Sequence, residues 1–145
     1  MSCGGDGVYI DDAGEVNIIG LFISAGDDSW DDGLWVDSNS LTIEPPFLIN
    51  KAGGYGIYAY GADFSLNNAT IKNCGKDAIH FYKGESLILR DSIIESCGGG
   101  LIYDNYAYGN AIIERNIIGN NTGSGIDIYL YASGSGDEVV INDNI

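Results

Sequence analysis

Apolar and polar residues alternate along short segments that recur at a nearly constant spacing. Each repeat begins with a similar segment, and the first apolar residues of these segments are Val8, Leu34, Ile57, Ile79, Ile102 and Ile126. The successive spacings between these markers are 26, 23, 22, 23 and 24 residues. A second apolar segment follows in each repeat, such as Leu87-Ile88-Leu89, and then a shorter third one, such as Ile93-Ile94. Alternation with a period of two is typical of strands that bury one face, so the pattern predicts three short strands per repeat.

A repeat of about 23 residues with three strands has the length of one coil of a parallel β-solenoid. No segment keeps a helical period, and the Leu-x-x-Leu-x-Leu signature of leucine-rich repeats is missing. The sequence therefore predicts one all-β domain over residues 1–145, a single-stranded parallel β-helix of about six coils. Equivalent residues on successive coils are then stacked about 4.8 Å apart.

Several segments are similar to those of a known family. They are the Gly-Ile-Tyr-Ala start at 56–59, the segment Asn-Asn-Ala-Thr-Ile-Lys-Asn-Cys at 67–74, and its echo Arg-Asp-Ser-Ile-Ile-Glu-Ser-Cys at 90–97. In these segments the chain resembles the right-handed parallel β-helix superfamily, which includes pectate lyases and polygalacturonases, over nearly its whole length. The resemblance implies a right-handed solenoid, an extracellular location and a polysaccharide groove along one sheet face.

The residue after each inward marker is expected to point outward. This outward row reads Tyr9, Trp35, Tyr58, His80, Tyr103 and Asp127, and the row two residues further on reads Asp11, Asp37, Tyr60, Tyr82, Asn105 and Tyr129. The two rows predict a face of rings bordered by carboxylates. Its candidate ligand-binding residues are Tyr9, Trp35, Tyr58, Tyr60, His80, Tyr82, Tyr103 and Tyr129. Such a face either stabilises the stack, binds sugar rings or a partner protein, or carries catalysis.

The candidate catalytic residues are Asp37 and His80 on this face, together with Asp104, and none of them belongs to a complete catalytic motif. His80 is the only histidine and has no matching carboxylate in its own coil. Asp104 would point inward in the predicted register, where an unpaired carboxylate is costly. Either the strand bulges after Tyr103, or the glycines at 98–100 shift the register by one residue.

A second catalytic hint is the Gly-Asp-Asp sequence at 26–28, which is similar to that of polygalacturonases. Glycoside hydrolysis requires two carboxylates. However, the Asn-Thr-Asp, Gly-His-Gly and Arg-Ile-Lys elements of that family are absent. We therefore expect a non-catalytic recognition module, with a polysaccharide lyase or glycoside hydrolase, or a fragment of one, as the alternative.

The charge of the chain excludes some partners and concentrates at one end. With 6 Lys+Arg and 21 Asp+Glu the net charge is −15, which disfavours nucleic acid and anionic membrane surfaces. Residues 1–50 contain no Lys or Arg. The loop at 26–33 holds four carboxylates that suit Ca²⁺, although their spacing fits no EF-hand. We expect a solvated acidic loop and no cofactor, with Ca²⁺ as the alternative, bound by Asp27, Asp28, Asp31 and Asp32.

Two further expectations follow from stacking. Cys74 and Cys97 are 23 residues apart at the same corner, so they should be stacked neighbours, as reduced thiols or as a disulfide, with Cys3 left over. Asn73, Ser96 and Asn120 should form a corner ladder that bonds backbone groups. The chain begins and stops within a coil without an evident cap. We therefore expect either a fragment of a longer solenoid or a homo-oligomer that covers the open ends.

Overall fold

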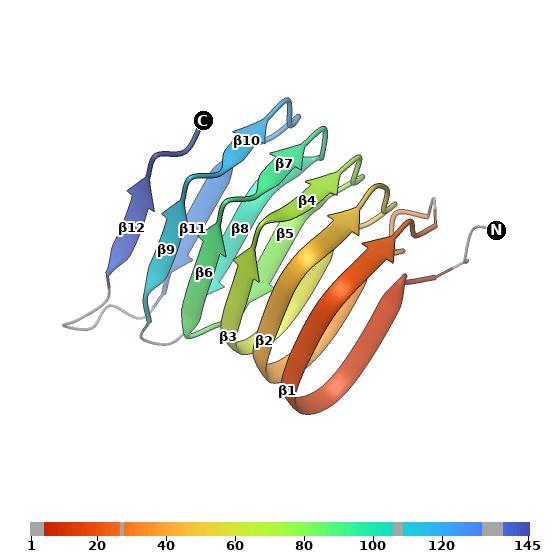
Figure 1. Ribbon diagram of the computed structural model, residues 1–145, viewed down its shortest axis with the longest axis horizontal. Helices are drawn as coiled ribbons and strands as arrows, with labels where there is room; N and C mark the ends of the chain where they lie inside the picture. Colours follow the sequence, from red (N-terminus) through yellow and green to blue (C-terminus); the bar gives the residue numbers. More distant parts are fainter. Residues whose placement is uncertain (1–4, 27, 106–108, 132–137) are drawn as a thin grey trace.

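The computed structural model describes residues 5–26, 28–105, 109–131 and 138–145. Parallel strands wind into a solenoid of about five turns, close to the six coils predicted (Figure 1). Among the described residues, no helix has the length and apolar character needed to cross a membrane. The strands are β1 (Val8–Ile23), β2 (Leu34–Ile49), β3 (Ile57–Asn67), β4 (Ala69–Lys72), β5 (Asp77–Tyr82), β6 (Ser86–Arg90), β7 (Ile93–Glu95), β8 (Gly99–Asn105), β9 (Ala111–Glu114), β10 (Ile117–Gly119), β11 (Ile126–Leu130) and β12 (Val139–Asn142).

Three sheet faces run along the solenoid (Figure 1). The first face consists of the first halves of β1, β2 and β3, followed by β5, β8 and β11. The second face continues through the later parts of β1, β2 and β3 to β6, β9 and β12, and the third consists of the ends of β1 and β2 with β4, β7 and β10. Because β1 and β2 pass through their corners as single 16-residue strands, the predicted three separate strands per coil appear only from the fourth coil on.

Inward side chains form columns that run along the solenoid and make up its core. Leu34, Ile57, Ile79 and Leu101 pair in register, and each is at most 1% exposed. Parallel columns continue on the second and third faces, so the core is one continuous cluster. Val8 pairs with Leu34, and the predicted inward markers are therefore confirmed for the first four coils.

The predicted register of the fifth coil is wrong by one residue. Leu101, not Ile102, pairs with Ile79 and with Ile126. Tyr103 consequently lies in the core with 0% exposure, its ring stacked on that of Phe81 at 5.3 Å, and cannot belong to the outward row. β8 already begins at Gly99, so the glycine run shifts the register, which was one of the two explanations considered.

The solenoid turns its corners through residues with left-handed backbone. Asn73, Ser96 and Asn120 have φ values of 59°, 59° and 56°. Short polar residues tolerate this conformation better than bulky ones, because their side chains bond locally. Of the expected corner ladder, the structure has the Asn73 amide donating to Oδ1 of Asn50, at an exposed position, over 3.2 Å. A second polar ladder lies elsewhere, and consists of the buried Ser92 and Asn116 and the half-buried Asn144.

The two cysteines at the corner are stacked neighbours, as predicted. Cys74 and Cys97 are both buried free thiols, and the backbone N–H of Cys74 donates to Sγ of Cys97 over 3.4 Å. The hydrogen bond with the neighbouring Cys97 sulfur raises the pKa of the Cys74 thiol, and burial raises it further, which keeps the thiol protonated. Cys3 lies outside the described residues.

Candidate functional site

The first face carries a row of rings that crosses four coils. Tyr9, Trp35, Tyr58 and His80 pair in register from β1 to β5, as the sequence predicts. The rings of Tyr9 and Trp35 stack at 4.4 Å and 13°, and those of Trp35 and Tyr58 at 6.3 Å and 7°. Beyond His80 the row continues with Ile102 and Asp127, so Ile102 takes the place expected for Tyr103.

A second outward row lies beside the first and contains both rings and carboxylates. It consists of Asp37, Tyr60, Tyr82, Asp104 and Tyr129, which pair in register from β2 to β11. The rings of Tyr60 and Tyr82 are 5.7 Å apart. Their neighbour Lys83 donates from Nζ to the Tyr60 hydroxyl over 3.0 Å, and the same ammonium lies over both rings.

His80 and Asp104 meet across adjacent coils. Nε2 of His80 lies 3.1 Å from Oδ2 of Asp104, and each side chain is 16% exposed. Asp104 pairs with Tyr82 rather than with His80, so the contact is a diagonal one between neighbouring strands. The register shift at the glycine run is what turns this carboxylate outward. A carboxylate partner is missing from the coil of His80 itself, because the partner, Asp104, belongs to the next coil.

The surroundings of His80 fix the orientation of its ring. Three tyrosine rings, from Tyr55, Tyr58 and Tyr82, approach its imidazole edge-on at 5.1, 5.2 and 6.1 Å. A carboxylate beside Nε2 accepts a hydrogen bond, so Nε2 carries the proton. Nδ1 is buried and has no hydrogen-bond partner in the described part of the chain. This nitrogen cannot contact a ligand without a rearrangement.

Tyr55 is a member of the site that the sequence interpretation missed. Its backbone N–H donates to Oδ1 of Asp32 over 2.7 Å, and its ring packs against Tyr58 at 5.6 Å. It lies two residues before the inward marker Ile57, which is the place of Asp32 and Asp77 in the neighbouring coils. A comparison of the residues two places before each inward marker would have identified Tyr55 from the sequence. Burial raises the pKa of the Tyr55 hydroxyl, and the carboxylates of Asp77 and Asp32 raise it further.

The acidic loop uses several of its carboxylates internally. Asp31 accepts from the backbone N–H of Asp28, and Asp28 accepts from that of Trp30, at 3.3 and 3.2 Å. Asp32 is buried, and its burial raises the pKa of its carboxyl group. The described residues contain no group of three His, Cys, Asp or Glu side chains placed to hold a metal ion, and Asp27 lies outside them. The expected Ca²⁺ alternative thus gains no support here.

The orientation of the rings decides which chemistry the face offers. Tyr9, Trp35 and Tyr58 are nearly parallel, so they turn much of their ring faces toward one another. The edges of these rings carry the phenol hydroxyls and the indole N–H, which are hydrogen-bonding groups. Tyr9 at the end of the row is 59% exposed. The face therefore offers apolar ring edges together with hydrogen-bonding groups and the carboxylates of the second row.

Comparison with known proteins supports the fold at the level of a family. A family model described as right handed beta helix region matches residues 2–145. No curated protein and no solved structure matches the chain. The comparisons therefore identify no substrate or ligand, and the chemistry of the first face has to carry any functional proposal.

Proposed function

Because the chain belongs to the right-handed β-helix family, we propose that it is a non-catalytic module whose first face binds a polysaccharide. The observation that carries this proposal is the row of Tyr9, Trp35, Tyr58 and His80, which crosses four coils without interruption. A continuous strip of rings on one side of a rod matches an extended ligand better than a compact one. Tyr9 is exposed and the other three rings are half-buried. Contiguous aromatic strips that reach the surface often mark binding faces.

The polar groups of the same face favour a sugar over an apolar partner. Phenol hydroxyls and the carboxylates of Asp37 and Asp104 lie beside the rings, and all of them can bond sugar hydroxyls. The net charge of −15 disfavours an anionic polymer. The ligand expected is therefore a neutral polysaccharide.

The rings are also held in place before any ligand arrives. Tyr60 is fixed by Lys83, and His80 by Asp104, and the strands beneath them are paired on both sides. Side chains that are already ordered lose little conformational entropy on binding. This rigidity supports recognition without a large change of shape.

Tryptophan fluorescence tests the proposal. In a Trp30→Phe background, Trp35 is the only tryptophan, so quenching reports on the first face alone. We expect saturable quenching by neutral oligosaccharides of at least six units, and none by oligogalacturonate at the same ionic strength. Tyr58→Ala should weaken binding at least tenfold, because aromatic anchors dominate such interfaces. Phe22→Ala, on the third face, is the matched control. If no neutral oligosaccharide binds, or if both variants act alike, the proposal is wrong.

A polysaccharide-cleaving activity is the second candidate, and the contact between His80 and Asp104 favours it. A carboxylate that orients an imidazole is a common acid–base arrangement. The buried Nδ1 weakens this candidate, because a base must reach the proton that it removes. An enzyme should release reducing ends or unsaturated sugars, and His80→Gln, Asp104→Asn or Asp37→Asn should abolish the release. Binding without any product favours the module.

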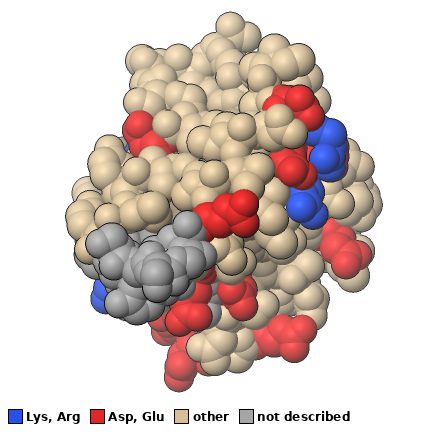
Figure 2. Space-filling view, turned by 90° about the vertical axis from the view of Figure 1, so that its left-hand side faces the viewer, with Lys and Arg blue, Asp and Glu red and all other residues tan. Residues whose placement is uncertain are grey.

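Self-association is the third candidate, and the last coil favours it. Val139 and Ile141 continue the core columns of Ala111 and Ile113, yet they are 37% and 52% exposed. A second copy seated on this end would bury them, as would further coils of a longer solenoid. Figure 2 looks onto this end and shows acidic side chains scattered around it. Because the first coils are acidic too, we expect any head-to-tail contact to strengthen with salt. A single monomeric species in sedimentation velocity at high protein and salt concentration would exclude it.

A further inference from the structure

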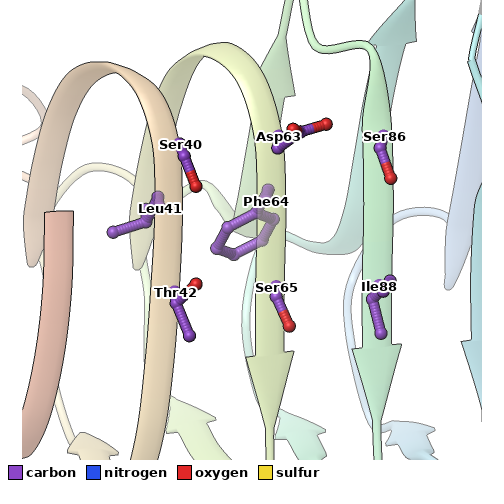
Figure 3. A pocket seen from close by; sticks show the side chains of 8 residues that line it. All are labelled: Ser40, Leu41, Thr42, Asp63, Phe64, Ser65, Ser86 and Ile88. Carbon is purple, nitrogen blue, oxygen red and sulfur yellow. The ribbon is translucent and has the colours of Figure 1, made fainter. Parts of the chain in front are cut away.

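A hollow on the second face lies around a corner from the aromatic rows. Two outward rows line it: Ser40, Asp63 and Ser86 on one side, and Thr42, Ser65 and Ile88 on the other (Figure 3). The buried residues Leu41 and Phe64 lie between the rows and belong to its lining. Its volume is about 240 Å³.

The polar side chains of this hollow have no partner within the part of the chain that the structure describes. The hydroxyls of Ser40, Thr42, Ser65 and Ser86 and the carboxylate of Asp63 make no side-chain hydrogen bond or ion pair to any described residue. Some polar residues elsewhere on the surface do pair with the next coil. Arg115 with Asp91 and Arg90 with Glu114 are examples, at 2.7 and 3.1 Å. The hollow thus gathers several hydrogen-bonding groups that the fold itself does not use.

We propose that this hollow binds one ring of a neutral polyhydroxylated ligand, such as a pyranose. Its volume lies below the roughly 300–1,000 Å³ typical of sites for drug-sized molecules, so it suits a single ring. Hydroxyl groups and one carboxylate match the hydroxyls of a sugar, and the side chain of Ile88 offers an apolar surface to its C–H groups. This second site lies on a different face and does not depend on the proposed function of the first.

Charge and rigidity narrow the class of ligand. Glu15 precedes Ser40 in the row of Asp63, so the two carboxylates lie in one row and repel an anionic sugar. The lining residues stand on paired strands above a closed core, which includes the contact between Phe64 and Phe81 at 5.4 Å. The site is preformed, but it is shallow, and we expect millimolar affinity.

Amide NMR of the ¹⁵N-labelled chain tests the proposal with methyl β-glucopyranoside as the probe. The expected result is a saturable set of shifts confined to residues 40–42, 63–65 and 86–88. Asp63→Asn should weaken binding at least tenfold, because it removes the charged acceptor. Ser65→Tyr should abolish binding by filling the hollow from an outward strand position. Asp143→Asn, which removes an exposed carboxylate from the last coil, is the matched control and should bind like the parent chain.

Several outcomes would overturn the proposal. One is the absence of saturable shifts, and another is a set of shifts confined to the first face. A third is an Asp63→Asn variant that binds the probe as tightly as the parent chain and unfolds at the same temperature. Equal binding of glucuronate would contradict the neutral class, and a response to CaCl₂ alone would reassign the hollow to a cation. Trp35→Ala should leave these shifts intact. Failure of the first-face proposal and failure of this one are therefore distinguishable.

Discussion

Oδ1 of Asn116 accepts a hydrogen bond of 2.9 Å from the backbone N–H of Ser92 in the preceding coil. The Asn116 amide also donates to the carbonyl of Leu89 over 3.0 Å and to Oδ1 of Asn144 over 2.9 Å. Asn116 is only 1% exposed, so its truncation leaves buried groups without partners. We expect Asn116→Ala to lower the free energy of unfolding by about 3 kcal/mol or more, measured by urea unfolding.

Asn50→Ala is the control for that substitution. Asn50 also bonds the asparagine of the next coil, but it is exposed, and water can replace the lost partner. Asn50→Ala should lower the free energy of unfolding by no more than about 0.5 kcal/mol. Equal effects of the two variants would contradict a special role for the buried ladder.

The corrected register of β8 can be tested with two adjacent residues. Tyr103 is fully buried against Phe81, whereas Ile102 lies in the outward row. Tyr103→Ala should cost about 3–5 kcal/mol, as for other buried aromatic residues, and Ile102→Ala less than about 1.5 kcal/mol. Chemical denaturation of both variants checks this. A larger loss of stability for Ile102→Ala than for Tyr103→Ala would instead support the register expected from the sequence.

The corner between the first and second faces requires glycine at one position of β3. Gly61 has a φ of 141°, and a Cβ there would collide with the carbonyl oxygen of Ser38 in the coil before it. Gly61→Ala should therefore destabilise the fold by about 3 kcal/mol or more. Gly14 lies at the corresponding corner of β1 with open space around it, so Gly14→Ala should be neutral or slightly stabilising in the same thermal unfolding measurement.

Acidification should stabilise the chain over part of the pH range. Burial raises the pKa of Asp32 and of Asp77 above 3.8, so each contributes stability that is present at low pH and lost as pH rises through the raised pKa. Arg115 lowers the pKa of Asp91, whose contribution is lost only as pH falls below 3.8. We therefore expect Tm to rise from pH 7 down to about pH 4 and to fall below that. Relief of the net negative charge acts in the same direction above pH 4.

Asp32→Asn isolates one part of this pH dependence. The amide oxygen can still accept from the backbone N–H of Tyr55, but it carries no charge to bury. The variant should be more stable than the parent at pH 7, and its Tm should vary less between pH 7 and 4. Calorimetry of both proteins between pH 7 and 4 checks this. If the Tm of the parent chain stays constant or falls as the pH is lowered from 7 to 4, the assignment of the raised pKa to Asp32 is contradicted.

The fold could be predicted because the same pattern of apolar and polar residues recurs in each coil. Leu34, Ile57 and Ile79 each begin an apolar alternation, and three coils in agreement outweigh any local ambiguity. The prediction became wrong at Leu101 and Ile102, where two neighbouring apolar residues both suit the inward place. The preceding glycines have no side chains to indicate which one is correct. The tight packing of Gly100 against the carbonyl of Gly125 is visible only in three dimensions.

The candidate site could be predicted only within single rows. Tyr9, Trp35, Tyr58 and His80 follow from the repeat, because residues in register become neighbours. The contact between His80 and Asp104 is diagonal, and it depends on the register that the sequence left open. The hollow of the second face depends on which polar residues find no partner. That is a property of side-chain lengths and directions rather than of spacing.

The parallel stacking of coils has a mechanical consequence. Hydrogen bonds between β1 and β2, and between later neighbours, run along the axis of the rod, while each strand lies across it. A force that pulls the last coil away therefore strains the bonds of that coil one after another instead of all together. Each coil of about 23 residues would release roughly 80 Å of extended chain. Under tension the rod should therefore lengthen in repeated steps at low force, one coil at a time.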